Sequence, residues 1–268
     1  MKDYKIIDFH IHPFLNRESN ICQHIDYCNM SAENTLNDLK KLGYYKVCGS
    51  VIYLKKSYQT FDDVKSQNDD ALTLRDMYGD FYIPGFHIHP KFVKKSIEEV
   101  ERMHKLGVKL VGELVPYLNG WSFSENDKNL YDILEACEHY GMIIDFHSTS
   151  NSEEDLNKMD EMVSRFKNLI FVGAHPGQEA KAFERSLHRM EKNDNYYLDW
   201  SGGGLLRRDA LRQAIDLFGK ERQVFGSDYP TCNPAMFVGG VALNYLLSEE
   251  EKEYIFNKNA SRLLGLDE

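Results

Sequence analysis

The sequence predicts an α/β protein, a single-domain (β/α)8 TIM barrel, and three observations lead to this fold class. Eight short apolar runs are rich in Val, Ile, Phe and Tyr, as strands are. Longer segments with helical spacing separate these runs, and the run ends lie roughly 26 to 42 residues apart. Strands that alternate with helices form a parallel sheet with crossover connections. Eight such units favour a closed barrel over an open, doubly wound sheet.

The expected strands are short for helices and end where polar residues begin. In chain order they are Tyr4–His12, Tyr45–Leu54, Phe81–His89, Val108–Val115, Met142–His147, Leu169–Ala174, Tyr196–Trp200 and Gln223–Asp228. The chain has no Gly-x-Gly-x-x-Gly turn and no P-loop. A nucleotide-binding sheet is therefore the weaker alternative.

Helix start and stop signals fall between these strands. Ser31 precedes the first helical pattern, and Gly43 ends it. The segments 152–155 and 248–251 resemble capping boxes. Five further glycines stand at or just after expected helix ends, where a left-handed residue is common: Gly79, Gly107, Gly141, Gly219 and Gly265. No composition break divides residues 1–268, and the polar stretch 13–30 is expected to form a loop over the barrel mouth.

Composition limits the classes of function. The net charge is -10 and the pI is about 5.5, which argues against a nucleic-acid partner. No signal peptide and no long apolar run is evident, so we expect a cytoplasmic protein without a membrane partner. The five cysteines form no Cys-x-x-Cys pair, and reduced thiols are expected. A homo-oligomer is left open.

Residues that can bind a metal stand at the carboxyl ends of the expected strands. Side chains alternate along a strand, so Asp8, His10 and His12 share one face. The carboxyl end of a barrel is where such proteins place their active sites. Mixed imidazole and carboxylate donors suit Zn²⁺, and also Mn²⁺, Fe²⁺ or Ni²⁺. The six candidate ligands are His10, His12, Glu113, His147, His175 and Asp228.

The order and spacing of these residues resemble the amidohydrolase superfamily. The segments 197–202 and 226–230 are similar to its amidohydrolase-2 branch, which includes decarboxylases as well as hydrolases. The resemblance spans almost the whole chain. It implies one metal held by His10, His12, His147 and Asp228. It further implies that His175 contacts the attacking water or substrate or ligates a second metal, and that Asp228 accepts a proton from the attacking water.

Glu113 departs from the pattern of many decarboxylases in that branch. Its segment, Val111-Gly112-Glu113-Leu114, resembles the strand end of TatD-like deoxyribonucleases, where the glutamate bridges two metals. If Glu113 bridges here, His147 and His175 bind the second ion, and hydrolysis is favoured over decarboxylation. A carboxylate paired with a nearby lysine or a substrate amine is the alternative role.

Substrate contacts are expected from residues near the strand ends. The candidates are His87, His89, Tyr117, Trp121 and Tyr229. The pair His87 and His89 repeats the spacing of His10 and His12, and is interpreted as pocket lining, with structural packing or metal binding as alternatives. The segment 201–204 could cradle an anion through its backbone N–H groups, although a turn before a helix is the favoured interpretation.

These observations predict a metal-dependent hydrolase that contains one or two divalent ions, most simply Zn²⁺. A metal-activated water would attack an amide, ester or lactone carbonyl of a small-molecule substrate, with Asp228 and His175 as catalytic residues. A non-oxidative decarboxylase of an aromatic or unsaturated acid is the first alternative. A TatD-like phosphodiesterase fits the acidic charge poorly, and a non-catalytic metal-binding barrel would not require a complete ligand set.

Overall fold

The computed structural model describes residues 3–16, 21, 31–54, 58–125, 127–177 and 179–266. Most of the expected loop 13–30, with Cys22, His24 and Cys28, lies outside the described residues. None of the described helices is both long and apolar enough to cross a membrane.

Eight parallel strands form one sheet in the order of the sequence, and the predicted (β/α)8 barrel is confirmed. The strands are β1 (Ile7–Ile11), β2 (Lys46–Gly49), β3 (Tyr82–Phe86), β4 (Leu110–Leu114), β5 (Ile143–His147), β6 (Ile170–Ala174), β7 (Tyr196–Asp199) and β8 (Gln223–Val224). The barrel closes between β1 and the segment that follows β8, where the N–H of Phe9 donates to the carbonyl of Phe225 at 2.8 Å. The N–H of His12 donates to the carbonyl of Tyr229 at 2.7 Å, which extends this contact beyond β8.

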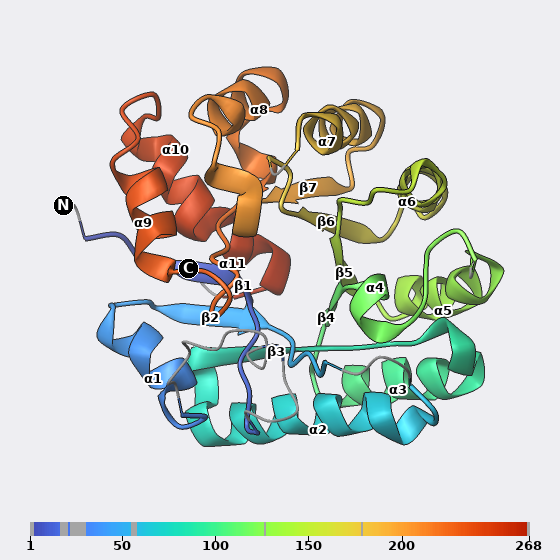
Figure 1. Cartoon of the computed structure of the whole chain (residues 1–268). Coiled ribbons are helices and arrows are strands. Elements are labelled where there is room, and N and C mark those ends of the chain that lie inside the picture. Colours follow the sequence, from blue (N-terminus) through green and yellow to red (C-terminus); the bar gives the residue numbers. More distant parts are fainter. Residues whose placement is uncertain are drawn as a thin grey trace.

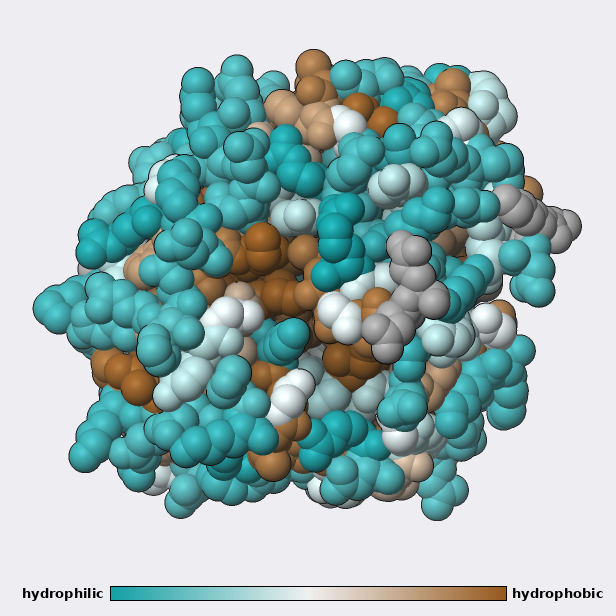
Figure 2. All heavy atoms as spheres, turned by 180° about the vertical axis from the view of Figure 1, so that it is seen from behind, coloured by the Kyte–Doolittle hydropathy of each residue, from teal (hydrophilic) through white to brown (hydrophobic). Residues whose placement is uncertain are grey.

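Helices surround the strands on the outside (Figure 1). They are α1 (Asn34–Lys41), α2 (Phe61–Tyr78), α3 (Val93–Lys105), α4 (Pro116–Asn119), α5 (Asp127–His139), α6 (Glu153–Arg165), α7 (Ala180–Lys192), α8 (Ala210–Phe218), α9 (Pro234–Ala242), α10 (Glu249–Glu253) and α11 (Asn259–Leu264). The face opposite to that of Figure 1 is largely hydrophilic, with hydrophobic residues gathered near its centre (Figure 2).

The strands are shorter than the apolar runs that predicted them. Four residues that the expected strands included lie in the loops after β1, β3 and β8 instead: His12, His87, His89 and Asp228. His175 follows β6, as expected. At Asp228 the reason is local, because its backbone is left-handed with φ of 59°, which a strand does not accommodate. His175 has the same conformation, with φ of 61°. The residues remain at the carboxyl edge of the barrel, where the sequence placed them.

The expected helix ends are confirmed in most cases. All six predicted helix-end glycines have positive φ, and Ser248 and Glu251 form a reciprocal capping box. Only one of the two hydrogen bonds of the capping box expected at 152–155 is formed. Ser152 Oγ accepts from the N–H of Asp155, but the Asp155 carboxylate accepts from the N–H of Ser124 at 2.9 Å instead of from Ser152.

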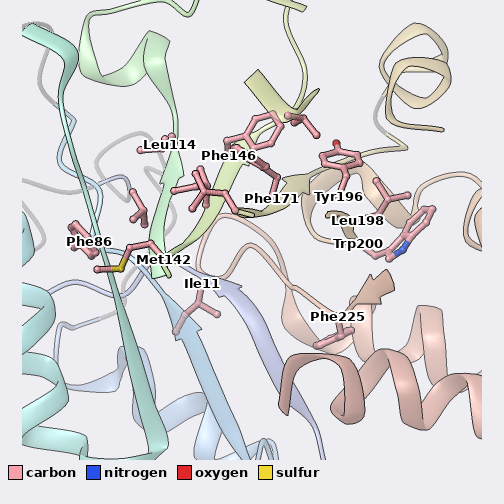
Figure 3. Close-up of a cluster of buried hydrophobic side chains, with 14 of the residues drawn as sticks. Ile11, Phe86, Leu114, Met142, Phe146, Phe171, Tyr196, Leu198, Trp200 and Phe225 are labelled. Carbon is pink, nitrogen blue, oxygen red and sulfur yellow. The ribbon is translucent and has the colours of Figure 1, made fainter. Parts of the chain in front are cut away.

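A large apolar cluster fixes the strands from which the polar residues project (Figure 3). The ring of Phe146 lies 6.3 Å from that of Phe171 and 6.2 Å from that of Tyr196. The indole of Trp200 is fully buried, and its Nε1–H donates to Gln223 Oε1 at 2.9 Å. Because side chains alternate along an extended chain, burial of Phe146 and Trp200 in this cluster turns their chain neighbours toward the opposite side.

Candidate metal centre

Five of the six candidate ligands converge at the carboxyl end of the barrel. The sixth, His147, contacts this cluster through Glu113. His10 lies within β1, Glu113 within β4, and His147 at the end of β5. His10, His12, Glu113 and His175 are nearly inaccessible, each at most 4% exposed. The side chains of His147 and Asp228 retain 14% and 16% exposure, which leaves them open to a ligand.

The Glu113 carboxylate stands between two pairs of histidines. Its Oε2 lies 3.4 Å from Nε2 of His10 and 3.3 Å from Nε2 of His12. Its Oε1 lies 3.0 Å from Nδ1 of His147 and 3.2 Å from Nε2 of His175. Each oxygen of one carboxylate therefore faces its own pair of imidazoles.

Asp228 completes the side of the site formed by β1. Its Oδ1 lies 3.5 Å from Nε2 of His12 and 3.9 Å from Nε2 of His10. The N–H of Asp228 donates to the carbonyl of His10 at 2.9 Å, so the loop after β8 is tied to β1. Left-handed φ values of non-glycine residues concentrate at functional sites, and both His175 and Asp228 have one.

The hydrogen-bond partners of the rings assign their tautomers. Nδ1 of His12 lies 3.1 Å from the carbonyl oxygen of Ser50, which can only accept, so Nδ1 carries the proton. Nδ1 of His10 lies 2.6 Å from Oδ2 of Asp199 and 3.4 Å from Oδ2 of Asp145. Two carboxylates on that side of the ring favour a proton on Nδ1, although its N–H is not aligned for a hydrogen bond to either one. In the neutral rings both Nε2 atoms then bear lone pairs, and they lie only 3.0 Å apart.

Two facing lone pairs beside two carboxylates fit a bound cation. Ligand atoms of His10, His12 and Asp228 lie within 4.8 Å of one another, as do those of His10, Glu113 and His175. A third group of this kind joins His10 to Asp145 and Asp199, but it uses the Nδ1 side of the ring, which holds a proton. His147 belongs to none of these groups among the described residues.

The carboxylates also favour positive charge on the rings. Burial alone would lower the pKa of His10, but Asp199, Glu113 and Asp145 raise it well above its usual value. Burial opposes the same change at His175, where Glu113 and Asp228 raise the pKa to about 9. Burial raises the pKa of Glu113, yet His10 and His175 hold it well below its usual value. The carboxylates of the cluster therefore favour added positive charge, which a divalent ion would also supply.

Asp145 and Asp199 are site residues that the sequence analysis did not assign. Oδ2 of Asp145 lies 3.4 Å from Nδ1 of His10, on the same side of that ring as Asp199. A signal for both was present: Asp145 precedes His147 by two residues on β5, and Asp199 ends β7 within the segment that carries the family resemblance.

A cavity of about 550 Å³ opens above the ligands. Its polar base includes His12, Glu113, His147, His175 and Asp228. Its apolar wall includes Tyr117, Leu118, Met236 and Phe237. None of the described residues that line it is a lysine or an arginine.

The predicted substrate contacts are divided between this cavity and the packed structure around it. Tyr117 lines the cavity, and its ring lies 5.4 Å from that of His147. Trp121 lines an adjoining cavity of about 470 Å³ that shares Tyr117 and His147 with the first. Tyr229 is 5% exposed and packs in the apolar cluster, so its side chain lies outside both cavities.

His87 and His89 also lie outside both cavities. His89 accepts from the N–H of Lys91 through Nδ1, and its Nε2 lies 3.0 Å from the carbonyl of Asn119, so the ring ties two loops together. Burial and the neighbouring His12 lower the pKa of His87 to about 3, which leaves a neutral ring behind the ligand cluster.

Comparisons with known proteins agree with this architecture. A family model described as Amidohydrolase matches residues 7–266. The 5-carboxyvanillate decarboxylase of Sphingomonas paucimobilis has a similar structure, with a TM-score of 0.73 and 14% identity over 98% of this chain and 99% of that one. A 2,6-dihydroxybenzoate decarboxylase in complex with 2,6-dihydroxybenzoate gives 0.72 and 15% over 100% of both chains. A TIM-barrel protein of Bordetella bronchiseptica gives 0.74 and 20% over 98% and 99%. A search of curated proteins found no match.

Proposed function

This chain belongs to the amidohydrolase family, and from that premise we propose that it is a metal-dependent hydrolase of a small molecule with an amide, ester or lactone bond. The family membership that the sequence motifs implied is confirmed. The roles of individual residues, including the TatD-like role of Glu113, stay predictions.

The position of Glu113 carries the proposal. One carboxylate whose two oxygens face separate histidine pairs is suited to bridge two divalent ions. We assign His10, His12 and Asp228 to one ion, and His147 and His175 to the other. His147 requires a small ring movement for this role, because its Nδ1 faces Glu113 while its Nε2 lies 2.8 Å from Thr149 Oγ1.

The donor set limits which ion fits. All proposed donors are imidazole nitrogens or carboxylate oxygens, a combination that suits Zn²⁺ and also Mn²⁺, Fe²⁺ or Ni²⁺. A similar structure, a 5-carboxyvanillate decarboxylase of Novosphingobium aromaticivorans at 14% identity, contains manganese. We therefore propose Zn²⁺ or Mn²⁺ as the first ions to test.

Hydrolysis would combine the chemistry of the bound ions with that of the chain's own side chains. Divalent ions at such donors lower the pKa of a water molecule and polarise a carbonyl oxygen. Asp228, which is close to His12 and partly open to the cavity, accepts the proton of the attacking water and transfers it to the leaving group. The apolar wall formed by Leu118, Met236 and Phe237 excludes bulk water and binds an apolar part of the substrate.

Decarboxylation of an aromatic acid is the second candidate. Several of the similar structures are named as decarboxylases of aromatic acids, and on that ground the comparisons favour this candidate over hydrolysis. The geometry favours hydrolysis, because two carboxyl side chains, Glu113 and Asp228, line the cavity and no described lining residue is a lysine or arginine that would bind a substrate carboxylate.

A metal count separates a centre of two ions bridged by Glu113 from a centre of one ion. We expect two ions per wild-type chain and one ion in Glu113→Gln, with Glu135→Gln, an exposed change on α5, as the matched control. One ion in both wild type and Glu113→Gln would contradict a bridging role.

The reaction class is tested separately on the metal-loaded protein. Lactone and amide substrates are followed by acid release, and 2,6-dihydroxybenzoate by release of CO2. Turnover of the first group supports hydrolysis, whereas CO2 release alone would replace it with the second candidate. Loaded protein inactive on all of them would favour a non-catalytic metal-binding barrel.

A further inference from the structure

Two residues at the end of β7, Asp199 and Ser201, contact histidines on two other strands. Oδ2 of Asp199 lies 2.6 Å from Nδ1 of His10 on β1. The same oxygen accepts the hydroxyl proton of Ser201 at 2.7 Å. Oγ of Ser201 lies 3.1 Å from Nδ1 of His175, which follows β6. One carboxylate thus reaches one ring directly and a second ring through a hydroxyl.

These contacts specify the direction of each proton. The Ser201 hydroxyl donates to Asp199, so its oxygen is left to accept, and Nδ1 of His175 must be the donor. Nδ1 of His10 faces the carboxylates of Asp199 at 2.6 Å and Asp145 at 3.4 Å, which favours a proton there although the N–H is not aligned for a hydrogen bond. Both neutral rings then present a lone pair at Nε2, on the side of Glu113.

We propose that Asp199, directly and through Ser201, is a positioning residue that fixes the tautomers of His10 and His175 together. This inference depends on the proposed metal centre, but it concerns residues outside the ligand set. Partners that orient a ligating histidine raise its basicity, and their loss typically costs about 10- to 100-fold in metal affinity.

The Asp199 carboxylate is tightly enclosed, so a side chain of another size or shape would not fit in its place. Asp199 and Ser201 are both fully buried, and the intervening Trp200 is anchored on the other side of the chain. Oδ1 of Asp199 accepts the N–H of Ser201 at 3.1 Å. A Cβ added at Gly226 would lie 2.2 Å from this Oδ1, so the backbone at Gly226 closes the space beside it.

All of the contacts described for the Asp199 carboxylate are acceptor roles, which makes Asp199→Asn a specific test. Either orientation of the new amide points its NH2 group at a donor: the N–H of Ser201, or the protons of His10 and the Ser201 hydroxyl. The substitution keeps size and shape but reverses one hydrogen-bond direction. Ser201→Ala removes only the connection to His175.

The experiment measures Zn²⁺ affinity of metal-stripped full-length protein by competition with a chromophoric chelator. We expect a loss of about 10- to 100-fold in Asp199→Asn and a smaller loss, confined to one ion, in Ser201→Ala. Ser186→Ala is the matched control, because Ser186 is also a fully buried serine but lies on α7 away from the site. Its affinity should equal that of the wild type.

A second readout reports the tautomers themselves. In Zn²⁺-loaded protein with ¹⁵N-labelled histidine, the low-field Nδ1–H resonances of two rings should be altered in Asp199→Asn and that of one ring in Ser201→Ala. Variants with wild-type affinity and unaltered resonances would overturn the inference. A greater loss in Asp145→Asn than in Asp199→Asn would assign the role at His10 to Asp145 instead. Wild-type protein that binds neither Zn²⁺ nor Mn²⁺ would refute the metal centre itself, which is a different outcome.

Discussion

Nε2 of His10 and Nε2 of His12 lie 3.0 Å apart, and Nδ1 of each ring faces an oxygen on the far side of that ring. Two neutral imidazoles in this arrangement repel each other unless a proton or a metal ion lies between them. The repulsion explains why both rings are buried next to carboxylates. It also means that the stability of the site depends mainly on how much positive charge it binds.

Metal binding should therefore stabilise the fold measurably. At free Zn²⁺ 100-fold above the dissociation constant, a ligand that binds only the native state adds about 2.7 kcal/mol. For a chain of this size that corresponds to a rise in Tm of roughly 5 to 10 °C. Differential scanning fluorimetry of chelator-treated protein with and without Zn²⁺ measures the shift. His12→Ala should reduce it, and an unchanged Tm in the wild type would contradict the assignment of these rings as ligands.

The binding of Zn²⁺ should weaken as the pH falls. The carboxylates of the site raise the pKa of His175 to about 9 in the metal-free protein, so this ring holds a proton below that pH. A metal requires the neutral ring, and binding must release the proton. Apparent affinity should rise with pH up to at least about 9, as this ring loses its proton. Calorimetric titrations at pH 7 in buffers of different ionisation enthalpy measure the released protons, and a count of zero is the contrary outcome.

Asp228→Asn should separate catalysis from metal binding. Loss of a positioned general base or acid typically costs about 10²- to 10⁴-fold in rate, while Glu113 and the histidines still hold metal. The measurement is kcat together with metal content, on whichever substrate class the activity screen identifies. Cys232→Ser is the matched control, since Cys232 lines the same cavity with its Sγ 3.8 Å from Oδ2 of Asp228. Equal kcat in Asp228→Asn and wild type would remove Asp228 from the mechanism.

The sequence predicted the barrel and the order of the site residues because period-2 alternation and strand order need no knowledge of distant contacts. Glu113 shows where this reasoning ends. Strict alternation places it on the same face as Val111, which packs in the large apolar cluster. A register shift between Val111 and Leu114 in the pairing of β4 with β5 interrupts that alternation, and Glu113 faces the histidines.

The partners of His10 were beyond sequence reasoning for a related reason. Asp145 and Asp199 come from strands β5 and β7, and they meet His10 of β1 only across the closed barrel. Alternation assigns each carboxylate to a face of its own strand, but it does not specify which ring the carboxylate meets on the other side.

Gly226→Ala should disturb the site through a single added methyl group. The new Cβ would lie 2.2 Å from Oδ1 of Asp199 and 2.7 Å from Cβ of His10, so one of these two side chains must shift. Overpacking of this kind costs about 1 to 3 kcal/mol of stability, and the displaced His10 should weaken Zn²⁺ binding about tenfold or more. Gly239→Ala is the matched control: nothing lies within 4 Å of its added Cβ, and in helix α9 alanine is favoured over glycine by about 1 kcal/mol. Thermal unfolding and chelator competition on both variants measure the two effects. A Gly226→Ala protein with wild-type Tm and Zn²⁺ affinity would mean that the contact between Asp199 and His10 tolerates displacement and does not set the geometry of the centre.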